Sequence, residues 1–179
     1  MSTRTAKFYS QPQTFTAPNL NLSYSYTNES IKMTLRLNTP HISTKAFPKT
    51  YEILQKIVPS VLTSQCFNDQ NLPFEEEVKA TEMGHLLEHI LLEYLCIEKM
   101  STGSFEADFS GETSWNWTED PHGTFMISID CSFEDYVHFL PALEKSIGVV
   151  EEILVSKLAG KVTYQSFQPT YPSRPTILS

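Results

Sequence analysis

The sequence predicts a single α+β domain, with a small, mostly antiparallel sheet and two to three helices packed on one of its faces. Stretches with an apolar residue at every second position predict strands, and stretches with apolar residues every three or four positions predict helices. The two kinds of stretch do not alternate strictly, which argues against a parallel α/β sheet. A chain of 179 residues, 40% of them hydrophobic, is long enough to bury one core.

The first part of the chain is polar and predicts little regular structure. Residues 1–29 are rich in Ser, Thr, Asn and Gln, and only "LNLSYSYT" (Leu20–Thr27) alternates as a strand does, so we expect an edge strand there. The α+β domain is expected over residues 30–158. Residues 159–179 contain three prolines and little periodicity, which predicts an extended or disordered tail.

Within the domain, strands and helices follow from the spacing of apolar residues. "IKMTLRLN" and "TFMISID" alternate and predict two strands. "FPKTYEILQKIVP" predicts a helix of about three turns, with Pro48 in its first turn. After a loop over residues 60–74, a long helix is expected from about Glu75 to Lys99. The last helix is expected from Phe133 to Leu158, with a kink at Pro141.

The segment "MGHLLEHILLEYL" predicts an amphipathic helix with a chemically unusual polar face. At 100° per residue, His85, Glu88, His89 and Glu93 fall opposite the apolar stripe. Histidines at positions i and i+4 of a helix can both reach one zinc ion, and Glu88 can serve as a general base without being a ligand. This H-x-x-E-H order is the inverted form of the zincin motif.

The sequence leaves the third metal ligand open. Glu93 can reach back toward His89, either to complete the coordination if the helix bends or to hold the His89 ring. A ligand from the acidic loop is the alternative, since Glu119, Asp120 and His122 cluster there. The three cysteines are far apart and have no CxxC spacing, which argues against a disulfide framework and against a thiolate zinc site.

A simpler interpretation of the histidines is that a polar helix face carries them by chance. Leu92 and Cys96 lie in the middle of that face, however, which indicates that it is partly covered. Covered histidines and carboxylates need partners. A metal ion is one such partner, and a hydrogen-bond network within a homodimer interface is another.

Charge and composition restrict the partners. A net charge of −8 argues against nucleic acid and favours a basic ligand. No apolar run is long enough to span a bilayer, and the N-terminus lacks the apolar core of a secretory signal. We therefore expect a cytoplasmic protein without membrane contacts.

Several segments resemble the N-terminal domain of cyanophycin synthetase. "GHLLEHILLEYL" is similar to its G-H-x-x-E-H-x-x-L-E-L-Q helix, and "FPKTYEILQKIVPSVLTSQCF" lies where that domain has a helix ending in L-P-x-L-x-x-H-x-C. "GETSWNWTEDPHGTFMISID" is similar to its G-x-T-R-x-T-D-E-P-G-x-Y segment, except that the family's T-R is Thr113-Ser114 here. Order and spacing agree from about Ile31 to Leu154.

This resemblance implies an α+β fold and an association with cyanophycin, a poly-aspartate chain that bears arginine on its side chains. In some members the H-x-x-E-H-x-x-x-E helix is a zinc site that cleaves this polymer. Carried over, His85 and His89 are ligands, Glu88 is the base, and Glu93 is a ligand or its support. The expected substrate-binding residues are Glu82, Trp115, Trp117, Glu119, Asp120 and His122.

The substrate-binding residues follow from the chemistry of guanidinium groups. Carboxylates bind guanidinium in a planar, bidentate manner, and tryptophan faces can stack on it. One of Trp115 and Trp117 is equally well explained as a core residue. The function expected is therefore zinc-dependent hydrolysis of amide or peptide bonds in cyanophycin or a similar arginine-rich polymer. The alternative is a non-catalytic domain that binds such a polymer or another protein.

Overall fold

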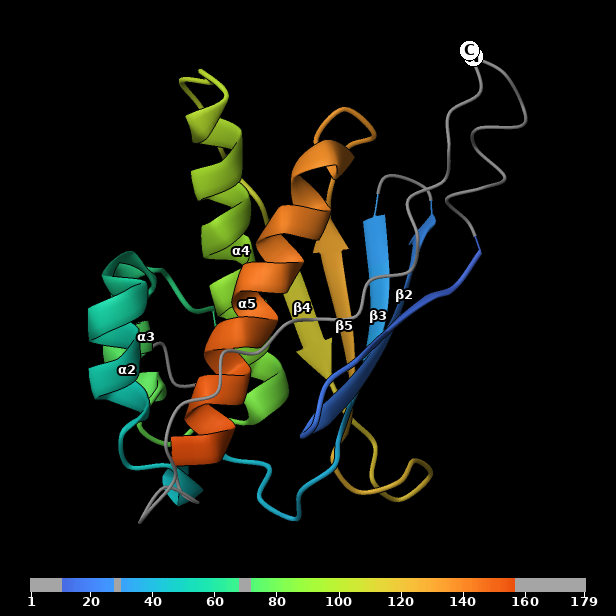
Figure 1. Ribbon diagram of the computed structural model, residues 1–179, viewed down its shortest axis with the longest axis vertical. Helices are drawn as coiled ribbons and strands as arrows, with labels where there is room; N and C mark the ends of the chain where they lie inside the picture. The colour runs from blue at the N-terminus through green and yellow to red at the C-terminus, as the bar shows by residue number, and fades with distance from the viewer. Residues whose placement is uncertain (1–10, 28–29, 68–71, 157–179) are drawn as a thin grey trace.

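The computed structural model describes residues 11–27, 30–67 and 72–156. It has a five-stranded antiparallel sheet with helices on one face, which confirms the α+β prediction (Figure 1). The strands are β1 (Gln13–Thr16), β2 (Leu20–Thr27), β3 (Ser30–Leu37), β4 (Gly111–Ser114) and β5 (Thr124–Asp130), in the spatial order β1-β2-β3-β5-β4. The helices are α2 (Thr50–Ile57), α3 (Phe74–Glu77), α4 (Met83–Ser101) and α5 (Tyr136–Ser156), with 3₁₀ turns η1 (Thr44–Ala46) and η2 (Pro59–Thr63).

The alternating strands lie where their patterns predict, but the sheet edge does not. β3 and β5 pair centrally, with Met33 opposite Ile127 and both side chains buried. The predicted edge strand Leu20–Thr27 is β2, which lies between β1 and β3. The edge strand next to β2 is β1, whose four residues are too few to show a periodicity, and β4 forms the other edge. The predicted tail at residues 159–179 lies outside the described residues.

The expected helix from Glu75 to Lys99 is two helices, α3 and α4. Thr81 interrupts it, because its N–H donates to the Thr44 hydroxyl over 2.9 Å and its carbonyl accepts from the Thr44 N–H over 2.8 Å. These bonds replace those that a continuous helix would make. Glu82 then forms an isolated bridge with Ser43 before α4 begins.

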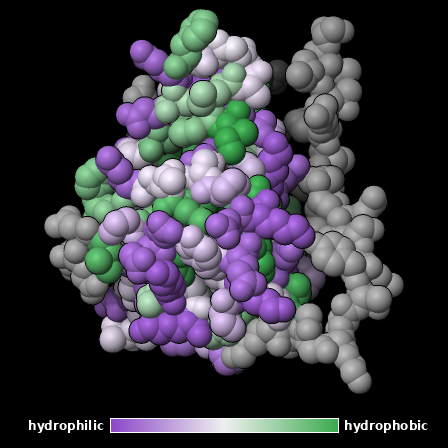
Figure 2. Space-filling model, turned by 90° about the vertical axis from the view of Figure 1, so that its left-hand side faces the viewer, coloured by the Kyte–Doolittle hydropathy of each residue, from purple (hydrophilic) through white to green (hydrophobic). Residues whose placement is uncertain are grey.

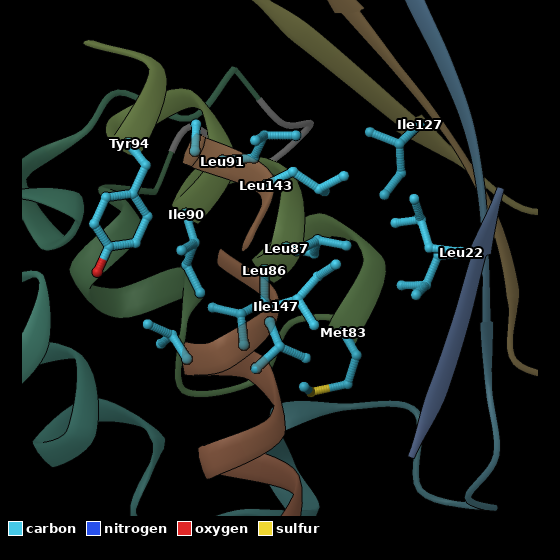
Figure 3. Packing of buried hydrophobic residues seen from close by; sticks show 14 of the residues in the cluster. Leu22, Met83, Leu86, Leu87, Ile90, Leu91, Tyr94, Ile127, Leu143 and Ile147 are labelled. Carbon is cyan, nitrogen blue, oxygen red and sulfur yellow. The ribbon is translucent and has the colours of Figure 1, made fainter. Parts of the chain in front are cut away.

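Helix α4 lies in the middle of the molecule and is buried on most sides. Figure 3 shows its apolar side chains packed between α5 and the sheet, with Leu87 near Leu143 and Ile127. Gly84 allows the close approach of α4 to β5, since a Cβ there would lie 2.8 Å from the Cβ of Phe125. On the opposite side of α4, Glu88 and His89 are buried as well, whereas His85, Leu92 and Cys96 are partly exposed.

The outer surface is mixed in character. Figure 2 faces the side with α2 and α3, where hydrophilic side chains cover much of the surface and hydrophobic ones gather toward the upper end. Among the described residues, none of the helices combines the length and the apolar character needed to cross a membrane.

Candidate metal centre

The two histidines of α4 point their Nε2 atoms at each other. These atoms, from residues one helical turn apart, lie 3.1 Å from one another. The thiol of Cys66, which follows η2, lies 3.4 Å from Nε2 of His85. One ligand atom from each of the three residues lies within 4.8 Å of the other two. The described part of the chain thus brings two nitrogens and one sulfur to a common point.

Two of the three separations are close to those of a tetrahedral zinc site, and the third, between Cys66 and His89, is at most 4.8 Å. Zinc bonds of ~2.0–2.1 Å to nitrogen and ~2.3 Å to sulfur place two nitrogens about 3.3 Å apart, and a nitrogen and a sulfur about 3.6 Å apart. The corresponding distances here are 3.1 and 3.4 Å. Three protein ligands leave the fourth position of a tetrahedron open, which is the arrangement of catalytic zinc sites.

Ser64 determines which nitrogen of His89 carries a proton. The Ser64 hydroxyl has one hydrogen, and it donates it to the Val61 carbonyl over 2.8 Å. The same oxygen lies 2.9 Å from Nδ1 of His89 and therefore accepts from the Nδ1–H. The other ring nitrogen, Nε2, is left with a lone pair that points toward His85 and Cys66. A lone pair so placed is what a metal ligand requires.

The surroundings keep both imidazoles neutral. The Phe74 ring stacks on the His89 ring at 3.8 Å. Burial, followed by the neighbouring His85, lowers the pKa of His89 to about 3. Burial also lowers the pKa of His85, whose Nδ1 lies 2.7 Å from the Thr81 hydroxyl. Both rings are therefore in the neutral form that binds metals at pH 7.

Glu88 lies against strand β4 and is not one of the residues that form the cluster, although it comes from the same helix as the histidines. Its carboxylate accepts a hydrogen bond from the Thr113 hydroxyl, and it is only 5% exposed. Burial raises the pKa of Glu88, and that effect exceeds the opposing one of the Thr113 hydrogen bond. Gly111 makes the close packing possible, since a Cβ there would lie 3.1 Å from Oε1 of Glu88. A buried carboxyl with a raised pKa is typical of a general acid or base.

The other proposed third ligands lie elsewhere. Glu93 is not among the described residues that form the cluster. Its charge acts instead on Cys96, where burial first, and then Glu93 and Asp108, raise the pKa of the thiol. Glu119, Asp120 and His122 are not part of the cluster either, and Glu119 and His122 are exposed.

The structure gathers the two tryptophans and His122 at a separate place. The rings of Trp115 and Trp117 stack at 5.7 Å, and both pack edge-on against Phe125, which in turn lies against Gly84 of α4. His122 lies 4.8 Å from the Trp117 ring. Trp117 is partly buried and donates from Nε1 to the Thr124 carbonyl, whereas Trp115 is exposed. These aromatic rings flank the beginning of α4.

Glu82 lies next to the metal centre. It immediately precedes α4 and is half-buried, and its charge raises the pKa of His85, although burial outweighs this effect. Among the predicted substrate-binding residues, Glu82 is therefore the one whose charge shifts the pKa of a histidine in the cluster, His85.

Cys66 and Ser64 were not among the site residues that the sequence predicted. They come from the segment after η2, 19 and 25 residues before the histidines that they contact. The lack of CxxC spacing led us to argue against a cysteine ligand. Cys66 does not need a second cysteine nearby, because the residues that share its site are histidines on another element. The signal that could have found them is the L-P-x-L-x-x-H-x-C pattern, in which Ser64 stands at the histidine and Cys66 at the cysteine.

Comparison with known proteins agrees with the resemblance seen in the sequence. No curated protein matches the chain. Residues 31–114 match the family model described as the cyanophycin synthase-like N-terminal domain. The match begins in β3 and ends with β4, so it includes Ser64, Cys66, Thr113 and the histidine helix. Residues 31–114 of the chain are therefore similar to the cyanophycin synthase-like N-terminal domain.

Proposed function

We propose that this protein is a zinc-dependent hydrolase of amide or peptide bonds, in which Cys66, His85 and His89 hold the metal and Glu88 is the general base. One observation carries the proposal. Two imidazole nitrogens and a thiol converge within 4.8 Å of one another, and the helix that carries the imidazoles also carries the buried carboxyl group of Glu88.

In the proposed hydrolysis, the metal ligands, Glu88 and Thr113 have separate roles. A zinc ion held there would polarise the substrate carbonyl and lower the pKa of water. Glu88 accepts the proton of the attacking water and passes it to the leaving amine. Its raised pKa suits this role, because a general base works best when its pKa lies near the working pH. The Thr113 hydroxyl fixes the orientation of the carboxylate by donating to it.

The proposed substrate is cyanophycin or another arginine-rich polymer. The net charge of −8 favours a cationic ligand. The carboxylates of Glu82, Glu119 and Asp120 form no ion pair with any described residue, so each is available to a guanidinium group. Cys66 requires reducing conditions to serve as a ligand, and the cytoplasm, which we propose as the location, provides them.

The experiment that tests the proposal measures zinc content and polymer cleavage in the same set of variants. After dialysis without chelator, we expect about one zinc per chain in the unmodified protein and in Glu88→Gln, and little in His89→Ala. Cleavage of cyanophycin is expected in the unmodified protein alone. Retained cleavage in Glu88→Gln and His89→Ala would refute the mechanism, and zinc binding without any cleavage would leave polymer binding as the function.

A further inference from the structure

Strand β4 ends the described sheet and has an unpaired edge. The N–H of Asp130 donates to the carbonyl of Ser110 over 2.9 Å, so these two residues form a hydrogen-bonded pair at the start of the β4–β5 ladder. Such pairs alternate along an antiparallel ladder. Glu112 and Ser114 therefore bond to β5, whereas the main-chain N–H and C=O groups of Gly111 and Thr113 point away from it. No described residue bonds to these groups.

This edge lies beside Glu88, on the helix that carries the two histidines of the metal centre. The side chain of Glu88 lies against Gly111 and Thr113 on β4, and His89 lies against Phe74 of α3. Residues 88 and 89 are about 100° apart around α4. The arc between them contains His85, Leu92 and Cys96, all of which are partly exposed. Solvent therefore reaches part of this arc, at His85 and Leu92, whereas the Cys96 thiol donates to the carbonyl of Ala107 over 3.7 Å.

We propose that the polymer or peptide substrate binds in an extended conformation, as an additional strand hydrogen-bonded to Gly111 and Thr113 at the edge of β4. This inference rests on the proposed function, because it treats the bound strand as the substrate of that site. Strand addition satisfies main-chain groups that the sheet leaves unpaired and does not depend on particular side chains. A strand in this position extends the sheet beyond β4 and lies next to the residues that contact Glu88.

The charges along this edge favour a cationic strand. Glu112 is exposed on β4, and its charge acts on Glu88. The charges of Glu93 and Asp108 both raise the pKa of Cys96, which lies about two turns after Glu88 on α4. None of these three carboxylates forms an ion pair with a described basic side chain. Arginine side chains on the added strand would supply the missing charge.

The other sheet edge provides an internal comparison. Ala17 donates to Leu20 at the β1–β2 turn, so by the same alternation Thr14 and Thr16 direct their main-chain groups away from the sheet. β1 lies at the opposite end of the strand order from β4. A peptide that binds because any free edge attracts it will protect both strands, whereas the proposed site predicts protection of β4 alone.

The test measures amide hydrogen exchange by NMR in the full-length Glu88→Gln variant, in which the peptide is not consumed. The probe is a blocked hexapeptide of alternating arginine and threonine. We expect exchange to slow at Gly111 and Thr113 and to stay unchanged at Thr14 and Thr16. Methylation of every peptide nitrogen should weaken binding by roughly tenfold or more, because the main-chain donors are lost. Citrulline in place of arginine should weaken it as well.

The outcomes separate this inference from the proposed hydrolase. Equal binding of the methylated peptide, or protection at β1 instead of β4, would overturn strand addition even if the protein cleaves cyanophycin. Protection at Gly111 and Thr113 in a protein that neither retains zinc nor cleaves the polymer would support strand addition and refute the hydrolase.

Discussion

The hydroxyl of Ser64 lies 2.9 Å from Nδ1 of His89 and leaves Nε2 of that ring for a metal. Because the Ser64 hydrogen is directed to Val61, the contact holds one tautomer as well as one ring orientation. Such outer partners of metal-binding histidines contribute to affinity although they never touch the ion.

Replacing Ser64 by alanine should therefore weaken zinc binding. We expect the dissociation constant to rise by about 10- to 100-fold, the usual effect of losing the partner of a ligating histidine. Thr63→Ala is the matched control, since Thr63 is exposed and donates only to the Ser60 carbonyl. Competition titrations with a chelator measure both constants. Equal affinities in the two variants would show that Ser64 does not orient the ring.

The third ligand is tested by a pair of substitutions. Cys66→Ser should lower the zinc affinity by about 100-fold or more, because a neutral hydroxyl is a much poorer ligand than a thiolate. Glu93→Gln should leave the affinity unchanged, because Glu93 lies outside the cluster. Zinc per chain after dialysis measures both. The reverse result would return Glu93 to the role that the H-x-x-E-H-x-x-x-E pattern gives it.

The sequence could predict local features of the structure, such as the face of a helix or the alternation of a strand. The spacing of His85, Glu88 and His89 defines one side of α4, and the alternation in β3 and β5 defines two central strands, because both patterns depend on neighbouring residues. Contacts between segments that are far apart in the chain could not be predicted from such patterns. Cys66 reaches the histidines from another element, and the break between α3 and α4 depends on hydrogen bonds between Thr44 and Thr81.

The prediction for Gly111 tests the packing of the general base. In Gly111→Ala the new methyl group would lie 2.8 Å from Cδ1 of Ile129 and 3.1 Å from Oε1 of Glu88. We expect a loss of about 1–3 kcal/mol in the free energy of unfolding, as is usual for overpacking, and a lower kcat with zinc still bound. Urea titration and cleavage assays measure the two effects.

The matched control for that substitution lies in α5. Apart from its chain neighbours and the backbone of its own helix, Gly148 has no heavy atom within 4 Å of the position that a Cβ would take. Alanine favours a helix by about 1 kcal/mol over glycine. Gly148→Ala should therefore stabilise the protein and leave kcat unchanged. Equal behaviour of the two variants would show that the Gly111 contact with Glu88 is unimportant.

The buried His89 predicts how the metal-free protein responds to acid. Its pKa falls from 6.5 to about 3 on folding, so between these values the unfolded chain binds a proton that the folded chain does not. The stabilising effect of the neutral ring is complete above pH 6.5 and is lost as the pH falls toward 3. Urea titrations in EDTA should thus give a lower free energy of unfolding at pH 5 than at pH 7. His89→Gln should reduce this difference, and an unchanged pH dependence in that variant would assign it to other groups.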